Sequence, residues 1–102
     1  MKTSTYTPGP LHVQPIMNDF RILGGPKLTI LAEVRNSHTH SAAANARLFA
    51  AAPELLDAAR AAERYIADEV SRGAALGVAM PAHTALLQQL RTAIDQAVES
   101  FS

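Results

Sequence analysis

The sequence predicts a small α+β domain in which an N-terminal arm and a small antiparallel β-sheet precede two to three helices. Two strand-like runs flank a Gly-Gly-Pro turn in the first third of the chain, whereas the rest is rich in alanine and has helical periodicity. A chain of 102 residues is expected to form one domain, residues 1–102. Within it, residues 1–36 form the arm and hairpin, and residues 41–102 form the helical part.

The arm and the hairpin follow from proline, glycine and side-chain alternation. Residues 7–15, TPGPLHVQP, contain three prolines, so they are expected to form an extended arm or, at most, a short edge strand. A hairpin is predicted over residues 20–35, around the turn sequence GGPK. Its second strand has one fully apolar face, which helices must cover because two or three strands cannot bury it themselves. That face is formed by Leu28, Ile30, Ala32 and Val34.

Three helices are predicted from caps and prolines. Ser41 is a suitable N-cap for a helix over residues 41–51. Proline is tolerated in the first turn of a helix but breaks its interior, so Pro53 is expected to begin a second helix over 53–71. Gly73 and Gly77 are expected to lie in the loop that follows, and Pro81 begins a third helix over 81–101.

The third helix carries more apolar surface than one neighbouring helix needs. Much of the chain's apolar content is alanine, which favours helix formation but buries little area. We therefore expect copies of the chain to associate into a dimer or a higher homo-oligomer. The expected interface is a seam of residues that alternate three and four apart, namely Leu87, Leu90, Ile94, Ala97 and Phe101.

Composition excludes several classes of partner. The formal net charge is zero, which argues against direct DNA binding or a membrane surface held by bulk electrostatics. No segment has the roughly 20 apolar residues of a membrane span, and the N-terminus lacks the apolar core of a signal peptide. Cysteine is absent, so thiol chemistry and disulfides are excluded. A location in the cytoplasm is expected.

No catalytic or metal-binding constellation is evident in the sequence. His38 and His40 form an HxH pair, but a structural zinc site needs four ligands and the other two are not apparent. The serines and threonines near these histidines lack the spaced carboxylate and the nucleophile turn of a hydrolase. We therefore expect a protein without catalytic residues, metal or cofactor, and not an enzyme.

A ligand-binding role is the main functional hypothesis from individual residues. Arg35, Arg47 and Arg60 could converge on an anionic ligand, because guanidinium groups bind carboxylates and phosphates in a bidentate manner. The alternative is a solvated face on which arginines pair with neighbouring carboxylates. Asn45 interrupts an alanine-rich helix, so its amide is expected to have a partner, either a backbone group of the hairpin or a ligand.

Two segments resemble a common family of small phage and prophage proteins. These segments are TPGP at residues 7–10 and ANARLFAAAPELLDA, which includes Asn45 and Pro53, and the strand sequence ILAEV accompanies them. In the resemblance, Leu11 replaces a usual tryptophan and Phe49 a usual isoleucine. The layout of a small sheet followed by long helices is also similar to that of the Thoeris anti-defence sponge family, whose members bind nucleotide-like immune signals between subunits without cleaving them.

The resemblance implies a non-enzymatic counter-defence protein of a mobile element. In one version, an oligomer sequesters a nucleotide-like immune signal through Asn45, Arg47 and either Arg60 or Arg35. In the other version, the chain inhibits a host defence complex, such as a CRISPR effector, by protein–protein contact. A phage accessory protein with neither role is a third possibility.

Overall fold

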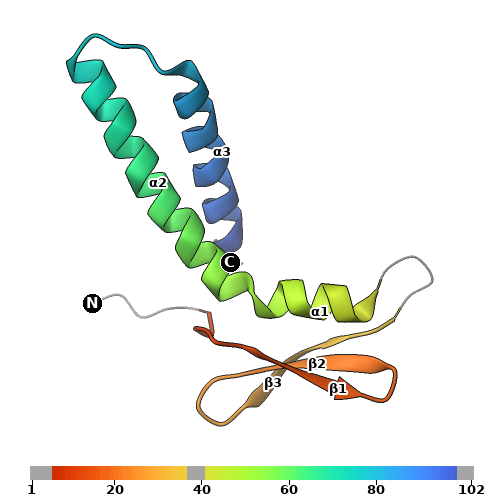
Figure 1. The fold of residues 1–102 in the computed structure, drawn as a ribbon. Coiled ribbons are helices and arrows are strands. Elements are labelled where there is room, and N and C mark those ends of the chain that lie inside the picture. The colour runs from red at the N-terminus through yellow and green to blue at the C-terminus, as the bar shows by residue number, and fades with distance from the viewer. Residues whose placement is uncertain (1–5, 37–40, 99–102) are drawn as a thin grey trace. The chain divides into compact units, whose positions relative to one another are not determined.

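A computed structural model describes residues 6–36 and 41–98 of the chain (Figure 1). A three-stranded antiparallel sheet is followed by three helices, which confirms the predicted α+β fold. The elements are β1 (His12–Ile16), β2 (Asp19–Gly24), β3 (Thr29–Val34), α1 (Ala42–Ala50), α2 (Ala52–Ala75) and α3 (Pro81–Val98). Residues 99–101, the predicted end of the third helix, lie outside the described residues.

The sheet is a meander with strand order β1-β2-β3. The hairpin predicted over residues 20–35 is confirmed by the antiparallel pairing of β2 with β3. The arm contributes β1, which pairs with β2 as an edge strand and contains Pro15. Proline cannot donate to a ladder, so its place on an edge is the expected one. β3 forms the other edge of the sheet and contains no proline.

A β-bulge in β3 overturns the predicted apolar face of that strand. The register is Leu23 opposite Ile30 but Ile22 opposite Ala32, so Leu31 is an extra residue on the bulged strand. The extra residue reverses the alternation, so Ile30 and Val34 do not share a face. Accordingly, Val34 is buried, whereas the Ile30 side chain is 50% exposed.

The hydrophobic core described by the structure lies between α1 and the sheet. Its buried members are Ile22, Val34, Ala42 and Ala46. Ala42 and Ala46 are one helical turn apart and fully buried, so the small side chains allow α1 to lie close against the strands. Alanine therefore has a packing role in this helix, in addition to its helix propensity. The partly buried apolar side chains that pack against this core are Leu11, Val13, Phe20 and Ala50.

The N-terminal arm lies against the start of α2. A Cβ atom on Gly9 would collide with the Glu54 carboxylate and would lie 3.2 Å from Pro53 Cβ. Pro53 is buried in this arrangement. The TPGP arm and the alanine-rich helical segment, which together carry the resemblance described above, therefore contact each other.

The predicted starts of the helices are confirmed to within a residue or two. Ser41 is the N-cap of α1, and its hydroxyl oxygen accepts a hydrogen bond from the Ala44 N–H at 3.2 Å. The chain bends at Ala51, and Pro53 occupies the first turn of α2, where its missing N–H costs no helical hydrogen bond. Pro81 begins α3 as predicted.

The end of α2 differs from the prediction, because the helix continues past Gly73 to Ala75. Gly73 is buried, and a Cβ there would lie 2.8 Å from Met80 Sδ. Val78 N–H donates to Gly73 O at 2.7 Å and Gly77 N–H donates to Ala74 O at 3.1 Å. With Gly77 at a φ of 73°, these two bonds form a Schellman cap. Gly73 therefore serves close packing, and only Gly77 serves the turn.

The chain forms two compact units, residues 1–55 and 56–102. The first contains the sheet, α1 and the first turn of α2, and the second contains the α2–α3 hairpin. The predicted division into residues 1–36 and 41–102 separates strands from helices, but α1 packs with the strands. No helix among the described residues combines the length and the apolar character needed to cross a membrane.

Candidate functional site

Asn45 and Arg47 lie on opposite flanks of α1. Ala42 and Ala46 of this helix face the sheet, so the side chains on either side of them define its two flanks. Residues two apart in an α-helix are separated by about 200° around the axis. Asn45 is half-buried on one flank, and Arg47 is exposed on the other. A ligand that contacts both side chains therefore has to extend around α1, or to lie between α1 and a further surface.

The amide of Asn45 has no hydrogen-bond partner within the part of the chain that the structure describes. Its backbone N–H donates to Ser41 O at 3.1 Å, in the ordinary helical pattern. The expected backbone partner in the hairpin is therefore not found among the described residues. A ligand partner for this amide stays a prediction.

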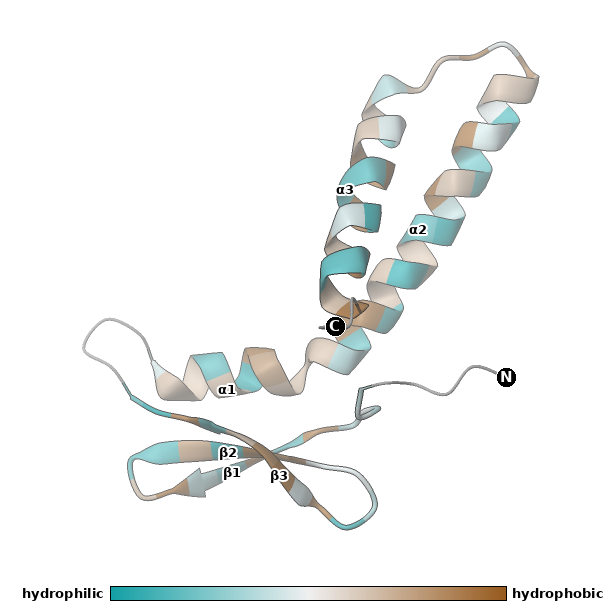
Figure 2. Cartoon of the chain, turned by 180° about the vertical axis from the view of Figure 1, so that it is seen from behind, coloured by the Kyte–Doolittle hydropathy of each residue, from teal (hydrophilic) through white to brown (hydrophobic). Residues whose placement is uncertain are grey.

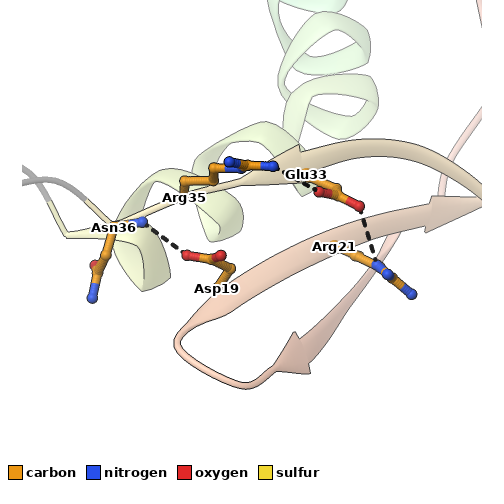
Figure 3. Close-up of polar contacts among 5 residues, drawn as sticks. All are labelled: Asp19, Arg21, Glu33, Arg35 and Asn36. Carbon is orange, nitrogen blue, oxygen red and sulfur yellow. Dashed lines mark hydrogen bonds and ion pairs between the residues drawn. The ribbon is translucent and has the colours of Figure 1, made fainter.

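Arg35 belongs to a charged cluster at the end of the β-hairpin (Figure 3). Glu33 lies between two arginines, with Arg21 Nε 3.5 Å from Glu33 Oε1 and Arg35 Nη2 3.8 Å from Glu33 Oε2. The Arg35 side chain is 79% exposed, so the pair that it forms is strongly screened by water. Arg35 is thus accessible to a further anion, whereas Arg21 is partly enclosed.

Asn36 connects this cluster to α1. Its backbone N–H donates to Asp19 Oδ1 at 3.2 Å, and its side-chain oxygen accepts a hydrogen bond from the Ala42 N–H at 3.1 Å. One residue therefore ties together the start of β2, the end of β3 and the first turn of α1. Asn36 was not singled out from the sequence. Its position shortly before an N-terminal helix cap was the one available signal.

A shallow cavity borders the charged cluster but is too small for a nucleotide. Its volume is about 40 Å³, whereas pockets that bind small organic ligands usually measure roughly 300–1,000 Å³. The cavity is lined by Ile16, Asp19, Phe20, Arg21 and Glu33. A nucleotide-sized ligand would need walls from outside this part of the molecule.

Arg60 lies on α2 in the second unit, whereas Asn45, Arg47 and Arg35 lie in the first. It is half-buried and takes part in a polar interaction. Within the first unit, Arg35 follows the end of β3 and is paired with Glu33, whereas Arg47 lies on α1. The predicted four-residue ligand site stays a prediction.

The predicted interface residues of α3 differ in exposure within one copy of the chain. Leu87 is buried, Leu90 and Ile94 are half-buried, and Ala97 is exposed. Phe101 lies outside the described residues. The start of the predicted seam is thus already covered within the chain itself.

Histidine and carboxylate side chains do not gather into a metal site in the described residues. No group of three or more His, Asp or Glu that could hold a metal ion occurs in residues 6–36 and 41–98. His12 and His83 are exposed. His38 and His40, the HxH pair of the sequence, lie outside these residues.

Several large apolar side chains that are close in sequence to the bend at Ala51 are exposed. Leu48 and Phe49 at the end of α1, and Leu55 at the start of α2, are each more than half exposed. Arg47 is also exposed on α1, about 200° around the helix axis from Phe49. Large apolar side chains that are exposed close together in one region are typical of protein contact sites, whereas isolated ones carry no such meaning. Sequence periodicity did not identify these residues as a surface.

The family model of the Salmonella phage P22 protein Y8K6 matches residues 1–100. The chain belongs to this family. The match spans both compact units, so the strands and the helical hairpin together form the family's unit. Membership in the Y8K6 family shows that this is a small phage protein. No curated protein and no solved structure matches the chain.

Proposed function

We propose that this phage or prophage protein is a non-enzymatic counter-defence protein that acts by binding in the cytoplasm of the bacterial host. The sequence favours sequestration of a nucleotide-like immune signal. The surface of the first unit gives more support to the other version, in which the protein inhibits a host defence complex such as a CRISPR effector. Membership in the phage family supports the setting of this proposal.

The exposed apolar group at the α1–α2 bend carries the proposal of protein contact. Leu48, Phe49 and Leu55 are large apolar side chains, and each is more than half exposed to solvent. Their burial against a partner would contribute about 25 cal/mol for each Å² of apolar surface removed from water. Arg47 lies about 100° around the α1 axis from Leu48 and could donate to a carboxylate of a partner that also reaches that flank of the helix.

A plating experiment tests the inhibitor version. The chain is expressed in host strains that each carry one active defence system, and phage plating efficiency is measured with and without it. We expect the wild-type chain to restore plating against one system and the double variant Leu48→Ser/Phe49→Ser to lose this effect. The purified wild-type chain should also bind the purified effector of that system, and the double variant should not.

Met17→Ser is the matched control for the double variant. Met17 is an apolar residue in the first unit that is almost fully exposed, and it lies in the turn between β1 and β2. This variant should keep the plating effect. Loss of the effect in Met17→Ser as well, or its retention in the double variant, would contradict the assignment of the contact to the α1–α2 bend.

A second candidate, the signal-binding oligomer, is favoured by the Asn45 amide that lacks a partner among described residues and by the exposed Arg47. A thermal-shift panel of cyclic nucleotides tests it. A ligand at about 100 times its Kd stabilises the fold by about 2.7 kcal/mol, which raises the Tm of a domain this small by roughly 10 °C or more.

Two alanine variants place the ligand site. Arg47→Ala should abolish the shift, whereas Arg64→Ala, an exposed arginine of α2, should keep it. If the role of Asn45 is purely structural, Asn45→Ala will change stability and leave the affinity unchanged. Absence of a shift with every cyclic nucleotide, together with effector binding, would exclude the signal-binding version.

A further inference from the structure

The α2–α3 hairpin has a defined seam between its two helices. Arg91 Nε on α3 lies 2.9 Å from Glu63 Oε1 on α2, and Leu87, one turn before Arg91, is buried. At the loop end of the hairpin, Gly73 of α2 contacts Met80 just before α3. These contacts fix the rotation of each helix about its own axis, and therefore which side chains lie to either side of the seam.

One side of this hairpin is lined mostly by apolar side chains. At about 100° per residue, a stripe on each helix lies roughly 60–120° from the seam, on the side away from the Glu63–Arg91 pair. Because the helices are antiparallel, both stripes lie on the same side of the hairpin. We call this side the apolar face. Its apolar residues are Ala58, Ala62 and Tyr65 on α2, and Leu86, Leu90, Ala93 and Ala97 on α3. The α2 stripe ends in the charged Glu69, which is paired with Arg72 of the same helix.

The other side of the hairpin is polar. It carries Arg60 and Arg64 on α2, and Gln88 and Asp95 on α3. Figure 2 shows hydrophilic and hydrophobic residues alternating along both helices, as expected when each helix has one polar and one apolar side. The polar side can remain in contact with water, so the apolar face is the side of the hairpin that would be stabilised by burial against a partner.

The second unit has little buried core of its own among its described residues. Leu87 is its buried large hydrophobic side chain, and the hydrophobic cluster of the structure belongs to the first unit. On the apolar face, Tyr65 and Leu86 are exposed and Leu90 is only half-buried. Two packed helices bury only the seam between them and leave their apolar side stripes exposed. In a four-helix bundle, the other pair of helices covers these stripes as well.

The α3 stripe is complementary in size to a second copy of itself. Its residues are spaced four, three and four apart, so the stripe reads the same in both directions. The two leucines occupy one half and the two alanines the other. If two α3 helices lie antiparallel about a two-fold axis between Arg91 and Thr92, Leu86 faces Ala97 of the second copy. Leu90 then faces Ala93 of the second copy, and each large side chain meets a small one.

We propose that two copies of the chain associate through the apolar faces of their α2–α3 hairpins into an antiparallel four-helix bundle. This inference does not depend on the proposed function. Of the interface predicted from the sequence, Leu90 and Ala97 keep their role. Leu87 packs within its own hairpin, and the proposal places Leu86 and Ala93 in the interface.

The size of the apolar face is sufficient for a specific dimer. The 18 residues of α3 span about 27 Å at a rise of 1.5 Å per residue, and two adjacent helices are about 20 Å wide. Two such faces remove roughly 1,100 Å² from water, which is above the roughly 1,000 Å² expected of a biological interface. The interface is at the small end of the range, so we expect a dimer that dissociates on dilution.

Sedimentation of two matched variants of the full chain tests the proposal. Ala93 and Thr92 are adjacent and exposed, but Ala93 lies on the apolar face and Thr92 does not. We expect the wild type and Thr92→Glu to sediment as dimers at about 100 μM, and Ala93→Glu as a monomer with unchanged helical circular dichroism. A monomeric wild type at this concentration, or a dimeric Ala93→Glu, would overturn the proposal.

Cysteine cross-linking tests the register separately, because the chain has no cysteine of its own. Leu90→Cys and Ala93→Cys chains are mixed and oxidised. The proposed two-fold axis places the two positions opposite each other in the heterodimer, so mixed cross-links should form several times faster than with either variant alone. Equal rates in the mixture and in the separate variants would rule out this register.

Discussion

Replacement of isoleucine by valine at two positions of the sheet measures the effect of the β3 bulge. Ile22 is 2% exposed and lies in the core, whereas Ile30 is 50% exposed on the strand that carries the bulge. Both substitutions remove one methylene group. Because only the surroundings differ, the pair tests which isoleucine the register buries.

The expected magnitudes follow from burial. Removing a fully buried methylene costs about 0.8 kcal/mol in transfer free energy, and the residual cavity raises the usual cost of Ile→Val to roughly 0.5–1.5 kcal/mol. We therefore expect Ile22→Val to lower the free energy of unfolding by about 1 kcal/mol. At half exposure, Ile30→Val should cost about 0.4 kcal/mol.

Urea and thermal unfolding followed by circular dichroism provide the measurement. For a domain of this size, a loss of 1 kcal/mol lowers the Tm by roughly 4–8 °C, so the two variants are readily distinguished. The protein concentration must be the same in all samples, because association would stabilise the fold. If Ile30→Val costs as much as Ile22→Val or more, the bulge and the register are wrong.

Three further substitutions test single contacts by thermal unfolding. Gly24→Ala places a methyl carbon 2.6 Å from Leu11 Cδ2 and should cost about 1–2 kcal/mol by overpacking; an unchanged Tm would contradict this. Asn36→Ala leaves the buried Ala42 N–H without its acceptor and should cost about 1 kcal/mol, whereas Asn36→Asp should retain most of the stability. Gly77→Ala forces alanine to a φ of 73° at a cost of about 1 kcal/mol, and a gain in stability would exclude the Schellman cap.

The elements that could be predicted from the sequence are those set by local chemistry. Ser41 acts through a hydroxyl that accepts from a nearby backbone N–H, and Pro53 and Pro81 act through the backbone preference of proline, so the helix starts were found without tertiary information. Gly73 shows where this reasoning fails. Its role depends on Met80, a residue that approaches from the loop, and no local preference of glycine reveals such a contact.

The bulge and the charged cluster could not be predicted, because both depend on register. Counting from the turn, an unbroken ladder would place Arg21 opposite Ala32; the extra residue places it opposite Glu33. Since Ile30, Leu31 and Ala32 are all apolar, the sequence gives no sign of which residue is extra. The Arg21–Glu33 pair is therefore a consequence of the bulge.

For the candidate ligand site, part of the geometry was available from the sequence. The separation of Asn45 and Arg47 around α1 follows from helical geometry once the face of Ala42 and Ala46 is known. The partition of the candidate residues between two compact units was not available, because α2 is one continuous helix that begins in the first unit and ends in the second.

The two edge strands of the sheet differ in their ability to pair with a strand of another molecule. Pro15 lies on the β1 border and cannot donate a hydrogen bond to an incoming strand, whereas the β3 border has no such block. Strand addition is therefore hindered on one side and open on the other. If two sheets paired through their β3 edges, both outer edges of the combined sheet would be β1 strands that contain Pro15. Edge-to-edge addition would therefore stop at a pair of molecules instead of continuing into a fibril.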